Sequence, residues 1–248
     1  WAGRGLGPFT TAALLYLAAA AAAIGLRLVA GSAGASLRRG DRGRVLVVAG
    51  FGGALAPTLL AWGLQRTGAT VGALLLNLEA VFTVLLARAV FREPIGRRVA
   101  LAVVAMIAGG AALTLDLSRS TSWSALGVAA VAGATLAWAL DNTLTRPLSE
   151  RDPLEVIAAK GAVGGAVTAA LATLRGEPLP SGPAVVALVA CGAIGYGLSL
   201  RFYLLAQRRI GAGRTGSMFA LAPFIGASVA VAVGDRVPGA WLGAAAVL

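Results

Sequence analysis

Histidine is absent from this chain, and cysteine occurs only once, at Cys191. A chain without histidine and with one cysteine lacks the usual ligand sets for zinc and haem and the Cys/His groups of thiol catalysis, so we expect no cofactor and no metal. One cysteine also excludes a disulfide within the chain. Charged residues are scarce, at 12%. What remains is apolar: 58% of the residues are hydrophobic and 34 are glycines, which is typical of integral membrane proteins.

Apolar stretches with few charges follow one another along the chain, and a ninth begins near residue 240. The complete ones occupy 9–30, 45–64, 70–90, 99–115, 124–145, 154–174, 183–206 and 215–233. Each is close to the ~20 residues that a helix needs to cross a hydrocarbon core ~30 Å thick. The connections are too short to hold a soluble domain. The sequence therefore predicts an all-α, polytopic integral membrane protein.

A faint repeat relates the two parts of the chain. The turn at 65–69, the span after it and the Arg-Glu-Pro turn at 92–94 recur about 143 residues later, beginning at 208–212. Five spans separate the copies, and an odd number inverts the second copy in the membrane, as in many secondary transporters. We expect one membrane domain built as an inverted repeat of five-helix halves, residues 1–116 and 117–248.

The same repeat predicts spans beyond both ends of the chain. The partner of 124–145 falls upstream of residue 3, and 99–115 predicts a last span near 241–258. We expect a parent protein of ten spans, with the first absent from this chain, the last truncated, and both ends in the cytoplasm.

Arginines indicate the orientation of the spans. Twelve lie in the connections 31–44, 91–98, 146–153 and 207–214, and five lie in the alternate ones. By the positive-inside rule the richer set is cytoplasmic. The net charge of +11 does not indicate nucleic-acid binding, because the arginines are spread over short connections rather than gathered in one patch.

Two stretches carry a resemblance to a known family. Residues 68–83, which include Asn77-Leu78-Glu79-Ala80, are followed by Phe91-Arg92-Glu93-Pro94-Ile95; the second copy reads Gly211-Ala212-Gly213 through Ala222-Pro223-Phe224-Ile225-Gly226. In order and spacing they resemble the signature of EamA-type transporters of the drug/metabolite transporter superfamily. One departure is that Glu79-Ala80 stands where many members carry a proline, as Pro223 does in the second copy.

The resemblance implies a secondary transporter, not an enzyme, that moves an amino acid, metabolite or drug across the inner (plasma) membrane in the direction of efflux. It also implies a central cavity lined mainly by the spans 45–64, 70–90, 183–206 and 215–233. The partners are then the solute, membrane lipid and protons as the coupling ion. The alternatives are a membrane-embedded enzyme, which would need clustered catalytic groups, and a non-transporting scaffold, against which the inverted repeat argues. The oligomeric state is not indicated.

Glu79 lies near the middle of the span 70–90, where a charge costs ~2.5–3.5 kcal/mol. Such a carboxyl avoids the cost by staying protonated, which makes it a natural proton carrier. Two interpretations stay open. Glu79 is either a coupling or substrate-binding carboxylate that faces the cavity, or a structural glutamate that is hydrogen-bonded between helices to Asn77 or Thr83.

Lys160 is the only lysine beside 20 arginines, so a compact, titratable ammonium is indicated at that position. It lies about 10 Å into the span 154–174, from a helical rise of ~1.5 Å per residue. Asp141 has a similar depth on the preceding, antiparallel span, and Asn142 follows it. Either Asp141 and Lys160 pair directly, or Lys160 reaches to the surface and Asp141 pairs with Arg146.

Two aromatic residues are further candidates. Trp62 and Tyr196 lie deeper in the spans 45–64 and 183–206. Either side chain is a candidate wall for an apolar or aromatic solute, and packing between helices is the alternative.

Overall fold

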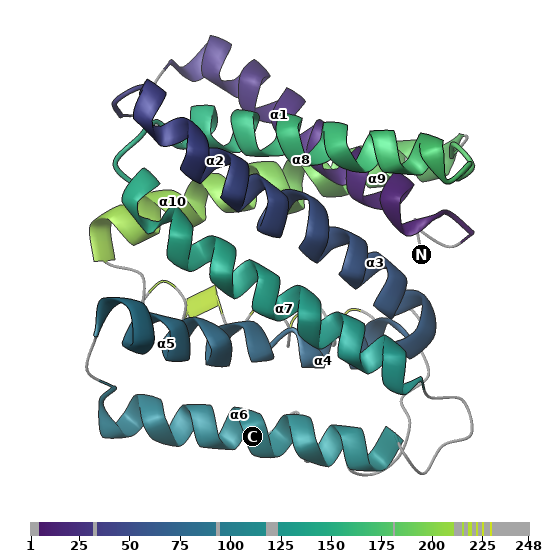
Figure 1. Cartoon of the computed structure of the whole chain (residues 1–248), viewed down its shortest axis with the longest axis vertical. Coiled ribbons are helices and arrows are strands. Elements are labelled where there is room, and N and C mark those ends of the chain that lie inside the picture. Colours follow the sequence, from purple (N-terminus) through teal and green to yellow (C-terminus); the bar gives the residue numbers. More distant parts are fainter. Residues whose placement is uncertain are drawn as a thin grey trace.

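The computed structural model describes residues 5–31, 34–92, 95–117, 124–180 and 182–210, and after these the single positions Thr215, Met218, Phe219, Ala222, Ile225 and Val229. These residues form helices and one isolated β-bridge, Ala35 to Arg151, and no β-strand is found among them. Six of the described helical segments are long and apolar enough to cross a membrane. The prediction of an all-α, polytopic membrane protein is confirmed (Figure 1).

The described helices cover seven of the predicted spans. The elements before residue 118 are α1 (Pro8–Ala30), η1 (Arg39–Asp41), α2 (Arg42–Val48), η2 (Ala49–Leu55), α3 (Ala56–Thr67), α4 (Ala69–Leu75), α5 (Leu78–Phe91) and α6 (Arg97–Leu117). Those that follow are α7 (Ala125–Thr145), η3 (Arg146–Leu148), α8 (Pro153–Leu174), α9 (Pro183–Cys191), η4 (Gly192–Leu198) and α10 (Ser199–Ile210). The predicted span 215–233 and the stretch that begins near 240 lie outside the described residues, apart from single positions.

Local chemistry sets where these helices begin and end. Proline stands in the first turn of α1, α8 and α9, where its missing N–H costs no helical hydrogen bond. Asp152 caps α8, because its side chain accepts a hydrogen bond from the Leu154 N–H at 3.0 Å. Gly68 separates α3 from α4 with a φ of 83°, a conformation that favours glycine.

Two long helices contain a π-helical stretch at equivalent places. The helix α2–α3 holds η2, and the helix α9–α10 holds η4, exactly 143 residues later by the bounds of both stretches. The helices after them, α3 and α10, have the same length and the same offset. The repeat that is faint in the amino acids is therefore clear in the backbone, down to an irregularity of hydrogen bonding.

The two copies run in opposite directions. Glu177, just after α8, accepts hydrogen bonds from the N–H groups of Phe9 and Thr10 at the start of α1. Arg27, near the end of α1, pairs with Asp152 at the start of α8. The equivalent helices α1 and α8 are thus antiparallel, and α2–α3 and α9–α10 cross the picture in opposite directions (Figure 1). This is the direction that an inverted repeat requires.

Each π-helical stretch packs against the other copy: η2 lies on α8, and η4 lies on α1. Glycines make the approach close. A Cβ on Gly53 of η2 would lie 3.1 Å from the carbonyl oxygen of Lys160 on α8, and one on Gly192 of η4 would collide with that of Leu15 on α1. Small residues at such crossings let helix backbones approach in a membrane. Large apolar side chains stay on the outer faces, among them Val29, Leu101 and Val186, as helices solvated by lipid require.

The arginine-rich connections come together at one end of the helices. The Ala35–Arg151 bridge joins two of them, Arg208 donates to the Arg151 carbonyl at 2.6 Å, and the Arg146 guanidinium lies over the Phe91 ring at 4.4 Å. The opposite end holds the Glu177 contacts with α1. The grouping that the arginine count predicts is therefore present in the fold.

Candidate functional site

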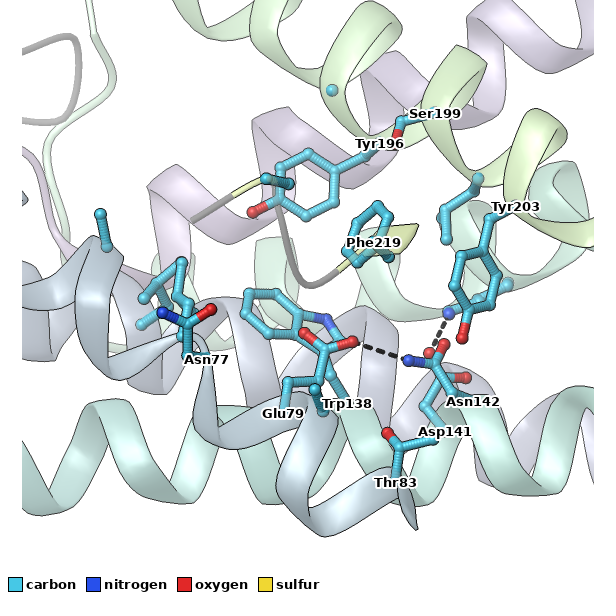
Figure 2. Close-up of a pocket in the computed structure, with 18 of the residues that line it drawn as sticks. Asn77, Glu79, Thr83, Trp138, Asp141, Asn142, Tyr196, Ser199, Tyr203 and Phe219 are labelled. Carbon is cyan, nitrogen blue, oxygen red and sulfur yellow. Dashed lines mark hydrogen bonds and ion pairs between the residues drawn. The ribbon is translucent and has the colours of Figure 1, made fainter. Parts of the chain in front are cut away.

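A cavity of about 300 Å³ lies between the copies, with walls from α1, α3, α4, α5, α7, α8, η4 and α10 (Figure 2). Its volume is at the lower end of the ~300–1,000 Å³ range of small-molecule sites. The lining residues are Tyr16, Leu60, Ala73, Leu76, Asn77, Glu79, Ala80, Thr83, Trp138, Asp141, Asn142, Lys160, Gly195, Tyr196, Ser199, Leu200, Tyr203, Phe219 and Ala222.

Lys160 of α8 and Asp141 of α7 form an ion pair at the wall of this cavity, in which Nζ donates to Oδ2. Both residues are buried, with 4% and 1% of their surfaces exposed. Thr145, one turn further along α7, donates to Oδ1 of Asp141 at 3.1 Å. Of the two arrangements open from the sequence, the structure contains the direct pair. Because both charges are withdrawn from solvent, each depends on the other for compensation.

Room for the ion pair comes from the π-helical stretch η2. A Cβ on Gly52 would collide with the Asp141 carboxylate and lie 2.8 Å from Nζ of Lys160. The carbonyl of Gly52 also accepts a hydrogen bond from Nε1 of Trp138 at 3.2 Å. The irregular backbone of η2 therefore lies directly against the polar wall of the cavity, a common position for π-helical turns at functional sites.

The span 70–90 is irregular where it passes the cavity, whereas the sequence predicts one continuous stretch. A turn at Leu76 and Asn77 separates α4 from α5. The N–H groups of Asn77 and Glu79 bond to carbonyls three residues back, at 3.1 and 3.0 Å, rather than four. Asparagine competes with the helix for backbone partners, which favours such a turn. Irregular backbone at membrane depth is tolerated where it is buried in protein or lines a cavity.

Glu79 lies in the first turn of α5, directly after this turn at Leu76 and Asn77. Nδ2 of Asn142, on α7, donates to Oε1 of Glu79 at 2.7 Å (Figure 2). The sequence offered Asn77 and Thr83 as partners, and both line the same cavity without bonding to Glu79. Oδ1 of Asn77 is buried and has no hydrogen-bond partner in the described part of the chain.

Aromatic rings cover much of the remaining wall. The Tyr196 ring lies 5.1 Å from that of Tyr16 and 6.3 Å from that of Trp138, between centroids. Nε1 of Trp138 also donates to the Tyr16 hydroxyl at 3.3 Å. On the far side, Tyr203 and Phe219 meet edge to face at 5.3 Å. The cavity is therefore lined with aromatic rings from α1, α7, η4 and α10 and with Phe219, and its charged side chains come from α5, α7 and α8.

Six of the seven candidate residues lie together in this cavity. They are Asn77, Glu79, Asp141, Asn142, Lys160 and Tyr196. Trp62 is not among the lining residues; its ring lies under the guanidinium of Arg66, 3.7 Å from the centroid.

Sequence reasoning passed over three aromatic members of the cavity, Tyr16, Tyr203 and Phe219. The chain has three tyrosines in all, and every one lines the cavity. The rarity of tyrosine in the chain could therefore have singled out Tyr16 and Tyr203, as the rarity of lysine singled out Lys160.

Among the residues that the structure describes, no group of three or more His, Cys, Asp or Glu side chains could hold a metal ion. The site is instead a polar wall with one ion pair and one hydrogen-bonded carboxyl, which can recognise a solute by charge and by ring contacts.

Comparison with known proteins agrees with this architecture. A curated relative, described as an uncharacterized transporter of Methanothermobacter thermautotrophicus, is 31% identical over 205 residues. The alignment covers 79% of this chain, and the chain spans 59% of the length of that relative.

A solved crystal structure is similar in fold, with a TM-score of 0.74 and 20% sequence identity, over 99% of this chain and 85% of that chain. The model of the EamA-like transporter family matches residues 1–115 and 125–248, nearly the whole chain. The chain therefore belongs to the EamA-like transporter family.

Proposed function

We propose that this protein is a secondary transporter that carries a small organic solute through the cavity by alternating access. One observation carries the proposal: the cavity lies between two oppositely directed copies of one helical unit, and its walls come from both. Inverted copies can exchange conformations and so open the same site to either side of the membrane. The family and the transporter relative support this assignment.

We further propose that Glu79 couples transport to protons. Among the described residues that line the cavity, it is the acidic group without a cation as hydrogen-bond partner, since Lys160 pairs with Asp141. A carboxyl in a membrane cavity is costly when ionised, so its protonation follows the access of water as the cavity alternates. The other groups that line the cavity and titrate are Tyr16, Tyr196 and Tyr203. Their ordinary ionisation lies far above neutral pH, which leaves Glu79 as the carrier.

Orientation and location complete the proposal. The arginine-rich connections 31–44, 91–98, 146–153 and 207–214 face the cytoplasm, and the protein spans the inner (plasma) membrane. Export is the direction that the family resemblance favours.

Reconstitution into proteoliposomes tests this function. A pH-sensitive dye inside the vesicles reports protons that move only when a solute is added, so unlabelled amines, amino acids and carboxylic acids can be screened together. We expect solute-dependent proton movement in the wild type and in Glu150→Gln, a control at an exposed glutamate. Glu79→Gln keeps the shape but fixes the charge at zero, and proton movement should disappear while solute exchange persists.

Two results would contradict the proposal in different ways. If no solute of any charge class moves through wild-type vesicles, transport through this cavity is wrong. If Glu79→Gln retains pH-dependent transport, the carrier function stands and Glu79 is not the coupling group.

A further inference from the structure

Several polar groups of the cavity are bonded to one another, and the groups that remain available indicate the kind of solute that the cavity can bind. The ammonium of Lys160 serves Asp141, and the amide of Asn142 donates to Glu79. The indole N–H of Trp138 donates hydrogen bonds to the Tyr16 hydroxyl and to the Gly52 carbonyl. Lys160, Asn142 and Trp138 thus each have a partner within the protein already.

The charges that remain are negative. Lys160 is the one cation among the described lining residues, and its charge is cancelled by Asp141. Among the described residues, the hydrogen-bond partner of Glu79 is the Asn142 amide, which accounts for Oε1 and leaves Oε2 for another donor. A further acceptor lies two residues before Glu79: Oδ1 of Asn77 is buried and has no partner among the described residues. The described lining therefore offers acceptors, and its one cation is already paired with Asp141.

The rings supply the second half of the recognition. Tyr16, Trp138 and Tyr196 form one cluster, and Tyr203 packs on Phe219. Aromatic faces are negative in their electrostatics, so they attract a cation within ~6 Å and also pack against apolar bodies. A carboxylate near the same faces would gain nothing from them.

We propose that the transported solute is a small organic monocation: a protonated amine, with an aromatic or apolar body, whose ammonium is bound at Glu79. This inference rests on the proposed function, since it takes the cavity as the transport site. The cavity of about 300 Å³ is large enough for a single-ring amine.

An amino acid fits the same cavity less well. Its carboxylate needs a cationic or strong N–H donor, and Lys160 can serve it only by leaving Asp141. That exchange would strand a buried carboxylate without its partner. Zwitterions and anions should therefore bind weakly.

A matched set of four probes tests the inference: phenethylamine, 2-phenylethanol, phenylalanine and 3-phenylpropionate. They share one ring and differ in charge. Binding to the purified protein in lipid nanodiscs is measured near neutral pH by isothermal titration calorimetry. We expect phenethylamine to bind about 10- to 100-fold more tightly than the other three, the difference expected for one charge-assisted hydrogen bond.

Variants locate the binding. Glu79→Gln should reduce phenethylamine affinity to that of 2-phenylethanol, and Glu150→Gln should leave it unchanged. Tyr196→Phe should retain affinity because the ring persists, and Tyr196→Leu should weaken it. The four-probe comparison on the wild type needs no variant, so it decides the charge preference even where a variant fails to fold.

The outcomes separate this inference from the proposed function. If phenylalanine or 3-phenylpropionate binds as well as phenethylamine, or if none of the probes binds, the cation assignment is overturned. If proteoliposomes move phenylalanine but not phenethylamine, transport stands and the cation assignment falls. If phenethylamine binds in a Glu79-dependent way but no solute moves, the cation assignment stands and transport falls.

Discussion

Gly53 of η2 and Gly164 of α8 touch backbone to backbone, so that a Cβ placed on Gly164 would lie 2.6 Å from the carbonyl carbon of Gly53. Because the atoms of Gly53 at this contact belong to the main chain, no change of side-chain rotamer can relieve the overlap. The contact joins one copy of the repeat to the other immediately behind the Asp141–Lys160 pair, since Gly53 also approaches the Lys160 carbonyl.

Gly164→Ala should therefore destabilise the protein by about 1–3 kcal/mol, the usual cost of overpacking. Gly25→Ala is the matched control, because Gly25 lies on the exposed side of α1 with nothing within 4 Å of its Cβ position. Thermal denaturation in detergent should show a lower Tm for Gly164→Ala and no loss for Gly25→Ala. Equal melting of the two variants would show that the contact is looser than described.

Asp141 and Lys160 should behave as one unit. Asp141→Asn and Lys160→Met each leave a buried charge without its partner, which costs about 3–5 kcal/mol, and the double variant leaves none. Each single change should lower the yield of folded protein and the Tm, and the double change should recover part of both. Losses that add strictly would mean that the two side chains are not coupled.

Asp152 joins two helices at the arginine-rich end through its two carboxylate oxygens. Oδ1 caps α8 at Leu154, and Oδ2 accepts from Nε of Arg27 at 2.9 Å. Asp152→Asn keeps a capping oxygen and loses the charge, whereas Asp152→Ala loses both. We expect the alanine variant to be the less stable by about 1 kcal/mol, measured by thermal denaturation. Glu150→Ala, at an exposed position nearby, should be neutral, and an alanine variant as stable as the asparagine variant would rule out the capping role.

The arginine count predicts which connections face the cytoplasm, and labelling of single cysteines can test this orientation directly. Cys191 is free and exposed, so it is first replaced by serine. In that background, cysteine at Arg175 should react in whole cells with a membrane-impermeant maleimide, and cysteine at Arg38 should react only after the cells are opened. The reverse pattern would invert the orientation proposed for every connection.

Hydropathy alone predicted the seven spans that the described helices cover, because burial in lipid is a property of composition over ~20 residues. It also predicted that the connections alternate between two ends. The helical rise predicted a similar depth for Asp141 and Lys160, which allowed the two side chains to meet, and the structure contains their ion pair.

The contacts across the bundle were beyond such reasoning. Glu79 and Asn142 are 63 positions apart, and their hydrogen bond depends on how α5 is rotated against α7. Periodicity is weak in helices that are apolar all round, so rotation cannot be read from the pattern. The turn at Leu76 and the stretches η2 and η4 were missed because a span is recognised by apolar length, which does not register a change in hydrogen-bond spacing.

The matched positions of η2 and η4 show that the two copies share one backbone frame, including the local departure from α-helical hydrogen bonding. The ionisable side chains of the cavity do not follow that frame, because the positions equivalent to Lys160 and Glu79 in the other copy are Leu17 and Ala222. A repeated backbone thus carries a site whose chemistry belongs to one copy at each position.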